Sequence, residues 1–133
     1  SFKKTNNLTD IDSEAKLFIE GMDSYDKKGV ETDIQLNVVN SMLDYIKKSN
    51  NTDLLPTNLI VGEEDANGIL NNYNELILDR NRILKSATLA NPTVLKMDQQ
   101  IMSLKQSLLS SLERLKSNLS IQKTNLKSQK KKC

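Results

Sequence analysis

Residues 69–108, ILNNYNELILDRNRILKSATLANPTVLKMDQQIMSLKQSL, decide the fold of this chain. Apolar residues recur at spacings of three and four on both sides of a break at 88–92, and side chains at these spacings share one face of a helix. A break this short favours antiparallel neighbours, so the stretch predicts a helical hairpin. The first arm carries Ile69, Tyr73, Leu76, Ile83 and Ala87, with Leu70, Ile77 and Leu84 beside them, and the second carries Met97, Ile101, Leu104 and Leu108.

The second arm of the hairpin begins at Pro92 and meets no helix breaker before about residue 130. Proline suits the first turn of a helix, where its missing N–H is not needed, and the Asn91 side chain before it can cap the helix. The spacing of four between Leu108 and Leu112 is an extra step, a stutter that locally relaxes a left-handed supercoil. The apolar stripe of this helix comprises Met97, Ile101, Leu104, Leu108, Leu112, Leu115, Leu119, Gln122 and Leu126.

A long heptad pattern precedes the hairpin and predicts a helix over about 10–49. Gly29 and Thr32 are poor core residues within it, and a glycine costs about 1 kcal/mol against alanine inside a helix. The register continues across both, although a bend or break near Asp26–Gly29 is the alternative. The stripe comprises Ile11, Ala15, Phe18, Met22, Tyr25, Gly29, Thr32, Leu36, Val39, Leu43 and Ile46.

A linker at 50–64, NNTDLLPTNLIVGEE, separates the first helix from the hairpin. Pro56 disfavours helix at the residue before it. The apolar run is too rich for a free loop, so we expect it to fold back over the end of the bundle; a short strand at 58–61 would lack an obvious partner. Asp65 can then cap the second helix, which we expect to run over 65–87.

The sequence therefore predicts an all-α fold, an elongated antiparallel three-helix bundle or coiled coil with one long, partly ordered linker. The helices are expected at about 10–49, 65–87 and 92–130 in a single domain, 1–133. Only four Gly and two Pro argue against an all-β fold, and the apolar residues are mostly Leu and Ile. Whether the first and third helices run in opposite or matched directions depends on the linker.

The residue types offer little chemistry. There is no His, and the single Cys is Cys133, so the commonest general base and an internal disulfide are both absent. The acidic cluster Glu63–Asp65 lacks the pattern of a calcium loop and is better interpreted as negative charge at a helix N-terminus. On the second helix, Asp79 pairs only weakly with Arg80 or Arg82, and Tyr73 is expected in the core with its hydroxyl at the edge. We predict no catalytic, cofactor-binding or metal-binding residue and no cofactor.

The last twenty residues are basic, although the net charge of the chain is only +2. A basic helix end can meet anionic lipid or nucleic acid, or it can simply complement the helix dipole. No aromatic residue interleaves the cations, which counts against binding of single-stranded nucleic acid. No apolar stretch is long enough to cross a membrane, no signal peptide is visible, and the ends of the chain indicate a fragment of a longer protein. The basic residues are Arg114, Lys116, Lys123, Lys127, Lys130, Lys131 and Lys132.

Several short motifs together resemble the periplasmic region of Wzc-like polysaccharide tyrosine autokinases, relatives of the Wzz chain-length determinants. They are the Leu-Pro-x-Asn-Leu stretch at Leu55–Leu59, the Tyr-Asn-Glu-Leu run at Tyr73–Leu76, the Asp-Arg-Asn-Arg-Ile-Leu run at Asp79–Leu84 and the Asn-Pro-x-Val at Asn91–Val94. The flanking helices are similar as well, so the resemblance covers most of the chain.

The resemblance implies the periplasmic portion of an inner-membrane protein whose kinase domain lies outside this chain. The fragment would then be a non-catalytic spacer and interaction module of a polysaccharide copolymerase that controls the chain length and export of capsular polysaccharide or exopolysaccharide. Its implied partners are further copies in a homo-oligomeric ring, the polysaccharide polymerase, the outer-membrane export protein and the glycan, and no nucleic acid. The sequence has no Walker-type phosphate loop, so kinase activity is carried onto no residue here.

Two other classes stay open. One is a cytosolic coiled-coil adaptor whose basic end contacts nucleic acid. The other is the helical hairpin of a periplasmic adaptor in an exporter, which would need flanking lipoyl-like β segments.

Overall fold

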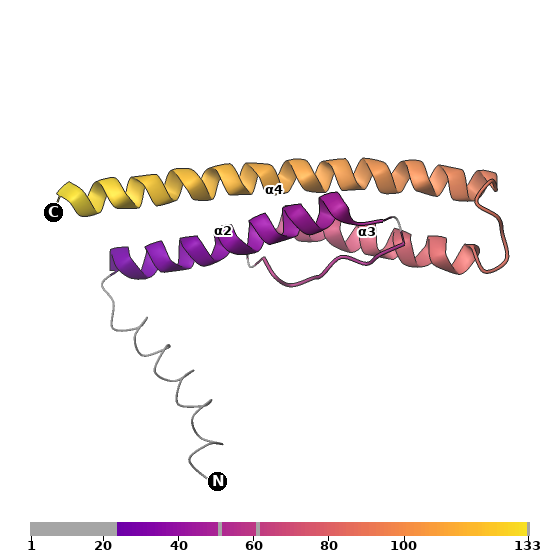
Figure 1. Ribbon diagram of the computed structural model, residues 1–133, viewed down its shortest axis with the longest axis horizontal. Helices are drawn as coiled ribbons and strands as arrows, with labels where there is room; N and C mark the ends of the chain where they lie inside the picture. The colour runs from indigo at the N-terminus through magenta and orange to yellow at the C-terminus, as the bar shows by residue number, and fades with distance from the viewer. Residues whose placement is uncertain (1–23, 51, 61, 133) are drawn as a thin grey trace, which may run out of the picture.

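The computed structural model describes residues 24–50, 52–60 and 62–132, and its fold is all-α as predicted (Figure 1). The helices within these described residues are α2 (Ser24–Lys48), α3 (Glu64–Ile83) and α4 (Pro92–Lys132). The ends of the first and third helices lie within two residues of their predicted positions. The predicted start of the first helix near residue 10, with the stripe positions Ile11 to Met22, lies outside the described residues.

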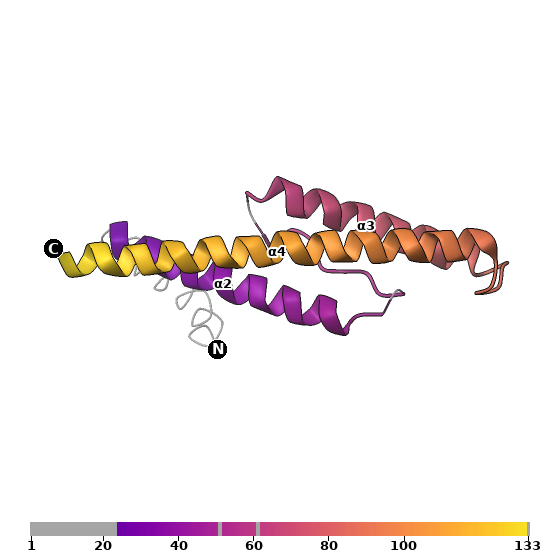
Figure 2. The same cartoon turned by 90° about the horizontal axis from the view of Figure 1, so that it is seen from above.

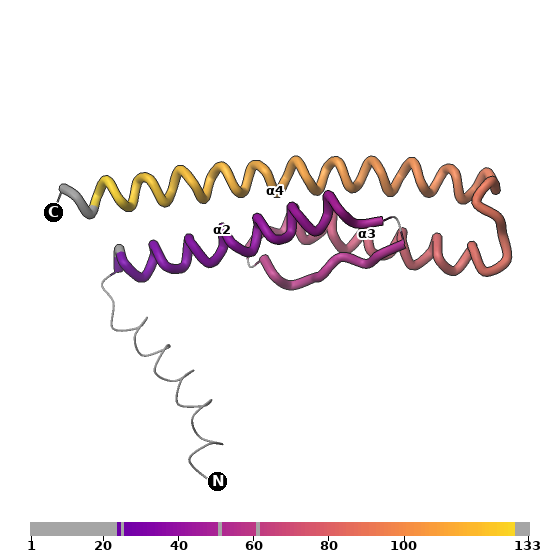
Figure 3. Tube along the Cα trace, in the orientation of Figure 1, coloured from indigo at the N-terminus to yellow at the C-terminus, as the bar shows by residue number. Residues whose placement is uncertain are grey.

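The bundle is built on α4, which packs against both other helices (Figures 1 and 2). The trace runs along α2, returns through the linker, runs along α3 in the same direction as α2, and turns back through α4 (Figure 3). Helices α2 and α3 are therefore both antiparallel to α4 and are offset along it. This offset leaves one end of α4 paired mainly with α2 and the other mainly with α3.

The linker explains why α2 and α3 run in the same direction. We call residues 50–63 the strap, because they run back between α2 and α3 on the side away from α4 (Figures 1 and 2). Leu55 is buried and Ile60 half-buried, whereas Leu54 and Leu59 are about half exposed. The expectation that this segment covers the end of the bundle is therefore wrong, since it covers a flank. No strand forms in the described part of 58–61, which excludes residue 61.

The core follows the predicted stripes on α2 and α4. On α4 every stripe residue is buried or half-buried, and on α2 the stripe from Thr32 onward is buried except for half-buried Leu36. On α3 the buried face is rotated, so Leu76 is half-buried whereas Ile77 is fully enclosed. The reason is that α4 covers one side of this helix and the strap covers another, which moves the centre of its buried face. The buried residues of α3 are Ala66, Leu70, Tyr73, Ile77 and Arg80.

Helix α2 continues through Gly29 without a break. A side chain at Gly29 would meet no atom within 4 Å, so the glycine is not required by close packing. The polar core residue Thr32 is accommodated because its Oγ1 donates to the carbonyl of Lys28, one turn earlier, at 2.7 Å. Of the alternatives of a bend or a break near Asp26–Gly29, the break is wrong, because the helix is continuous there.

The C-terminal end of α3 differs from expectation. The helix stops at Ile83 rather than near Ala87. The amide of Lys85 donates to the carbonyl of Arg82, and the amide of Ser86 donates to that of Ile83. These i→i−3 bonds tighten the chain into a turn, so the apolar spacing continues past the point where the helix ends.

Of the two helix caps predicted from the sequence, one is confirmed and the other is wrong. The amide of Thr93 donates to Oδ1 of Asn91 at 2.9 Å, which confirms the cap before Pro92. For α3 the cap position is Glu63, which makes no side-chain capping bond, so the prediction that Asp65 caps this helix is wrong. Gly62 precedes it with φ of 84°, a left-handed conformation that glycine adopts without strain and that turns the strap into the helix.

Candidate functional site

Three asparagines on α3 hold the strap in place. Asn67, Asn74 and Asn81 are spaced by seven residues and so lie along one face of the helix. Their side-chain Nδ2 atoms donate to strap carbonyls: Asn67 to Ile60 at 2.8 Å, Asn74 to Leu55 at 3.0 Å and Asn81 to Thr52 at 3.3 Å. We call this set the asparagine column. It satisfies backbone groups of an extended segment that has no strand beside it.

Asn74 is the central member of the asparagine column because it bonds both polar groups of one strap residue. Its Oδ1 accepts from the amide of Leu55 at 2.8 Å while its Nδ2 donates to the carbonyl of the same residue. The carboxamide thus replaces a neighbouring strand, and the bond pair fixes Leu55 so that its side chain enters the core. Helical periodicity does not predict this role of Asn74, although the repeat of Asn at seven-residue spacing is a signal for it in the sequence.

We expect Asn74→Ala to lower the free energy of unfolding by about 2 kcal/mol, since two part-buried backbone groups lose their partner. Hydrogen exchange should show the amide of Leu55 losing most of its protection, and urea denaturation gives the change in stability. Asn72→Ala is the matched control, because Asn72 is an exposed asparagine on the same helix. Equal loss of stability in both variants would contradict the role of the asparagine column.

A buried ion pair joins α3 to α4. Nε of Arg80 donates to Oδ1 of Asp98 at 2.5 Å, and the Arg80 side chain is only 7% exposed. Its Nη1 is buried with no hydrogen-bond partner among the described residues. The prediction of a weak surface pair holds for Asp79 with Arg82, at 3.1 Å and well exposed. It is wrong for Arg80, whose partner lies across the hairpin.

Tyr73 is fully buried, so the expectation that its hydroxyl lies at the edge of the core is wrong. The hydroxyl has no partner of full hydrogen-bond geometry within the described part of the chain. Burial raises the pKa of Tyr73, and a smaller opposing influence comes from the Ser49 side chain. The core therefore favours the neutral phenol, and ionisation of this group at alkaline pH opposes folding.

Lys105 ties α4 to the end of α2. Its Nζ donates to the carbonyl of Ser49 at 3.0 Å, just past the last residue of α2. A cation is favourable at this position because the C-terminal carbonyls of a helix carry partial negative charge. No local signal in the sequence indicates the contact of Lys105 with a carbonyl 56 positions earlier in the chain.

The acidic cluster lies at the start of α3, as interpreted from the sequence. Glu64 and Asp65 are in the first helical turn, where negative charge complements the dipole. Within the described ranges, no group of three or more His, Cys, Asp or Glu side chains could hold a metal ion.

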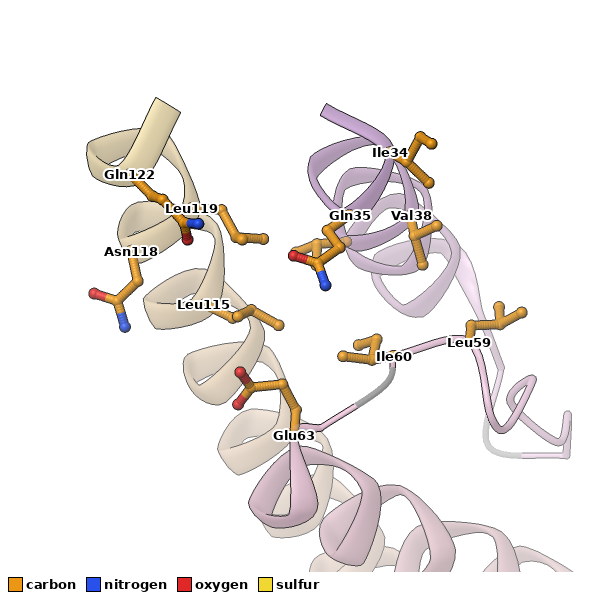
Figure 4. A pocket seen from close by; sticks show the side chains of 11 residues that line it. Ile34, Gln35, Val38, Leu59, Ile60, Glu63, Leu115, Asn118, Leu119 and Gln122 are labelled. Atoms are coloured by element: carbon orange, nitrogen blue, oxygen red, sulfur yellow. The ribbon is translucent and has the colours of Figure 1, made fainter. Parts of the chain in front are cut away.

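An apolar groove of about 340 Å³ opens between α2 and α4 where α3 begins (Figure 4). Leu115 and Leu119 of α4 point toward α2, and Ile60 of the strap enters from below. Amide and carboxylate side chains surround these apolar groups. The residues that line the groove include no nucleophile next to a general base. The groove can accept an apolar side chain, and it offers no arrangement for covalent chemistry. Its remaining lining is Ile34, Gln35, Val38, Val39, Leu59, Glu63, Asn118 and Gln122.

Part of the basic C-terminal region has a structural role. Nζ of Lys123 lies 2.7 Å from Oδ1 of Asp33, an ion pair that connects α4 to α2. Lys116 is half-buried, whereas Arg114 and Lys127 are exposed.

No protein-family model, curated protein or solved structure matches the chain. None of the helices in the described part of the chain combines the length and the apolar character that a membrane crossing needs. The described residues thus form an elongated all-α bundle (Figure 1).

Proposed function

We propose that this chain is a non-catalytic, periplasmic spacer and interaction module of an inner-membrane polysaccharide copolymerase, a Wzc-like tyrosine autokinase. In this role it would help to control the chain length and export of capsular polysaccharide or exopolysaccharide. The kinase domain lies outside the chain, and we expect no catalysis and no nucleotide binding from these residues alone.

The observation that carries the proposal is that two motifs of the resemblance are bonded to each other in the fold. Asn74, of the Tyr73–Leu76 run, holds the backbone of Leu55, of the Leu55–Leu59 stretch. Arg80, of the Asp79–Leu84 run, joins α3 to α4 through Asp98. Two motifs that are separate in sequence are thus held together, and a third joins the two arms of the hairpin through a residue outside the motifs. Such contacts are expected of motifs that maintain one fold.

The shape of the molecule also supports a spacer. Helix α4 has 41 residues and is therefore about 60 Å long at 1.5 Å per residue. The exposed fractions of Leu89 and Met102 exceed one half, so apolar contact groups remain on a long surface. Further copies in a ring are the first expected partner, followed by the polysaccharide polymerase, the outer-membrane export protein and the glycan.

The test belongs in the full-length protein. Replacing residues 50–64 by a flexible linker of equal length removes the strap, so α2 and α3 lose their fixed relation. We expect the exported polysaccharide to change in length or amount, measured by gel electrophoresis or light scattering, while membrane insertion and kinase folding persist. Thr57→Ser, at an exposed strap position, is the control and should leave the polysaccharide unchanged. An unaltered polysaccharide in the linker variant would remove the case for a regulatory module.

A further inference from the structure

Charge is divided between the two layers of the molecule. Helix α4 holds nine basic and two acidic residues, a net charge of +7. Residues 24–83, which form α2, the strap and α3, hold six basic and ten acidic residues, a net charge of −4. We call the second group the acidic layer and α4 the basic helix. They lie on opposite sides of the core, so the molecule has an acidic side and a basic side (Figures 1 and 2).

Both sides expose charge and apolar surface together. On the acidic layer, Glu64 and Glu75 are exposed on α3, as are Lys96 and Arg114 on the basic helix. Large apolar side chains that are about half exposed accompany the charges. These are Ile34, Tyr45, Leu54 and Leu59 on the acidic layer, and Met102 and Ile121 on the basic helix.

We propose that the acidic layer of one copy docks on the basic helix of the next copy. This inference rests on the proposed function, because it names the faces through which the copies of a ring would touch. The contact is heterologous: it joins two different surfaces, and a repeated contact of this kind closes into a ring when its rotation permits. Charge complementarity favours this pairing, and like-charged faces oppose the alternatives of acidic layer on acidic layer or basic helix on basic helix.

The positions of the charged groups along the long axis of the bundle agree with neighbouring copies that lie side by side without an axial shift. Arg80 pairs with Asp98, and α3 and α4 are antiparallel with the same rise per residue. Sixteen residues before Arg80 is Glu64, and sixteen residues after Asp98 is Arg114, so these two opposite charges lie at the same height.

The apolar groups obey the same relation. Asp33 pairs with Lys123 across α2 and α4. Ile34 follows Asp33 by one residue and therefore lies at the height of Gln122, beside Ile121. Neighbours at equal height can thus match an acidic with a basic group and an apolar with an apolar group.

Sedimentation velocity of the 133-residue chain, kept reduced because of Cys133, tests the contact at up to about 1 mM, the effective concentration of linked modules. We expect concentration-dependent association that weakens about tenfold when salt rises from about 0.1 M to about 1 M, since the Debye length falls from about 10 Å to about 3 Å. Neutralising the acidic layer, whose net charge Glu64→Lys and Glu75→Lys raise from −4 to 0, should weaken association about tenfold. Lowering the net charge of the basic helix from +7 to +3, with Lys96→Glu and Arg114→Glu, should have an effect of similar size.

Mixing the acidic-layer variant with the basic-helix variant distinguishes a heterologous contact from any other. Each two-residue variant keeps one native face, so the two together should form a one-to-one complex that does not grow. A chain with Glu64→Lys and Arg114→Glu together keeps opposite charges at one height and should associate more strongly than a chain with either of these two substitutions alone. The control variant, Lys27→Glu with Lys28→Glu, changes the net charge by the same amount as each two-residue variant. Both positions are exposed on the acidic layer, and this variant should not weaken association. Circular dichroism verifies that each variant is folded.

No association of the native chain at about 1 mM would overturn the inference. So would native-like association of both two-residue variants, or a mixture that forms no complex. These results are separable from a failure of the proposed function, because association is measured without polysaccharide, membrane or kinase domain.

Discussion

We expect Asp98→Ala to lower the free energy of unfolding by about 3 kcal/mol, because it leaves the buried guanidinium of Arg80 without its counter-charge. The Arg80 side chain is 7% exposed and that of Asp98 28%, so water reaches the pair from the carboxylate side only. Nη1 of Arg80 already has no partner in the described part of the chain, and nothing else there offsets the loss. Urea denaturation followed by circular dichroism measures the change.

Asp79→Ala is the matched control, since it removes an aspartate that pairs with an arginine at an exposed position. It should cost only about 0.2–0.5 kcal/mol. Replacing both partners of the pair, with Arg80→Met and Asp98→Leu, should recover most of the stability, because an apolar pair needs no desolvation of charge. Comparable losses for Asp98→Ala and Asp79→Ala would contradict the importance of burial.

We also expect Ile101→Ala to lower the free energy of unfolding by about 2–5 kcal/mol. Ile101 is fully enclosed in the core, where α4 meets the other elements, and truncation leaves a cavity that the surrounding helices cannot fill completely. The next residue, Met102, is 62% exposed, and Met102→Ala should change stability by less than about 0.5 kcal/mol. Because the two substitutions are at adjacent positions of one helix, they differ mainly in the burial of the side chain.

Thermal and urea unfolding of both variants gives the result. The loss of stability for Leu104→Ala should lie between those for Ile101→Ala and Met102→Ala, because Leu104 is half-buried beside the core. A large loss for Met102→Ala together with a small one for Ile101→Ala would mean that α4 presents a different face to the core.

The periodic parts of the fold could be predicted from sequence because their determinants are local. Spacings of three and four define the helical faces, and Asn91 with Pro92 marks a helix start through contacts within a few residues. These signals correctly predict almost all of α4 and the C-terminal end of α2. The end of α3 was misplaced because Leu84 and Ala87 continue the apolar spacing into a turn.

The parts that the sequence did not reveal depend on contacts between distant positions. Leu55 enters the core at the point where Asn74, nineteen residues later, binds its backbone. Arg80 is buried only because Asp98 meets it across the hairpin. The course of the strap then determines that α2 and α3 run in the same direction, which no periodicity encodes. The asparagine column was the one signal in the sequence that could have indicated this arrangement.

The return of the strap has a mechanical consequence. Because α2 starts and α4 finishes at the same end of the rod (Figure 1), tension applied between residues 24 and 132 pulls these helices apart one side-chain pair at a time. The pair of Asp33 with Lys123 lies near that end and would bear load early. Tension between residue 24 and the turn at 84–91 instead acts along the helix axes, so it must slide α2 along α4 and break many core contacts at once. The rod is thus weak against peeling at its base and resistant to stretching along its length.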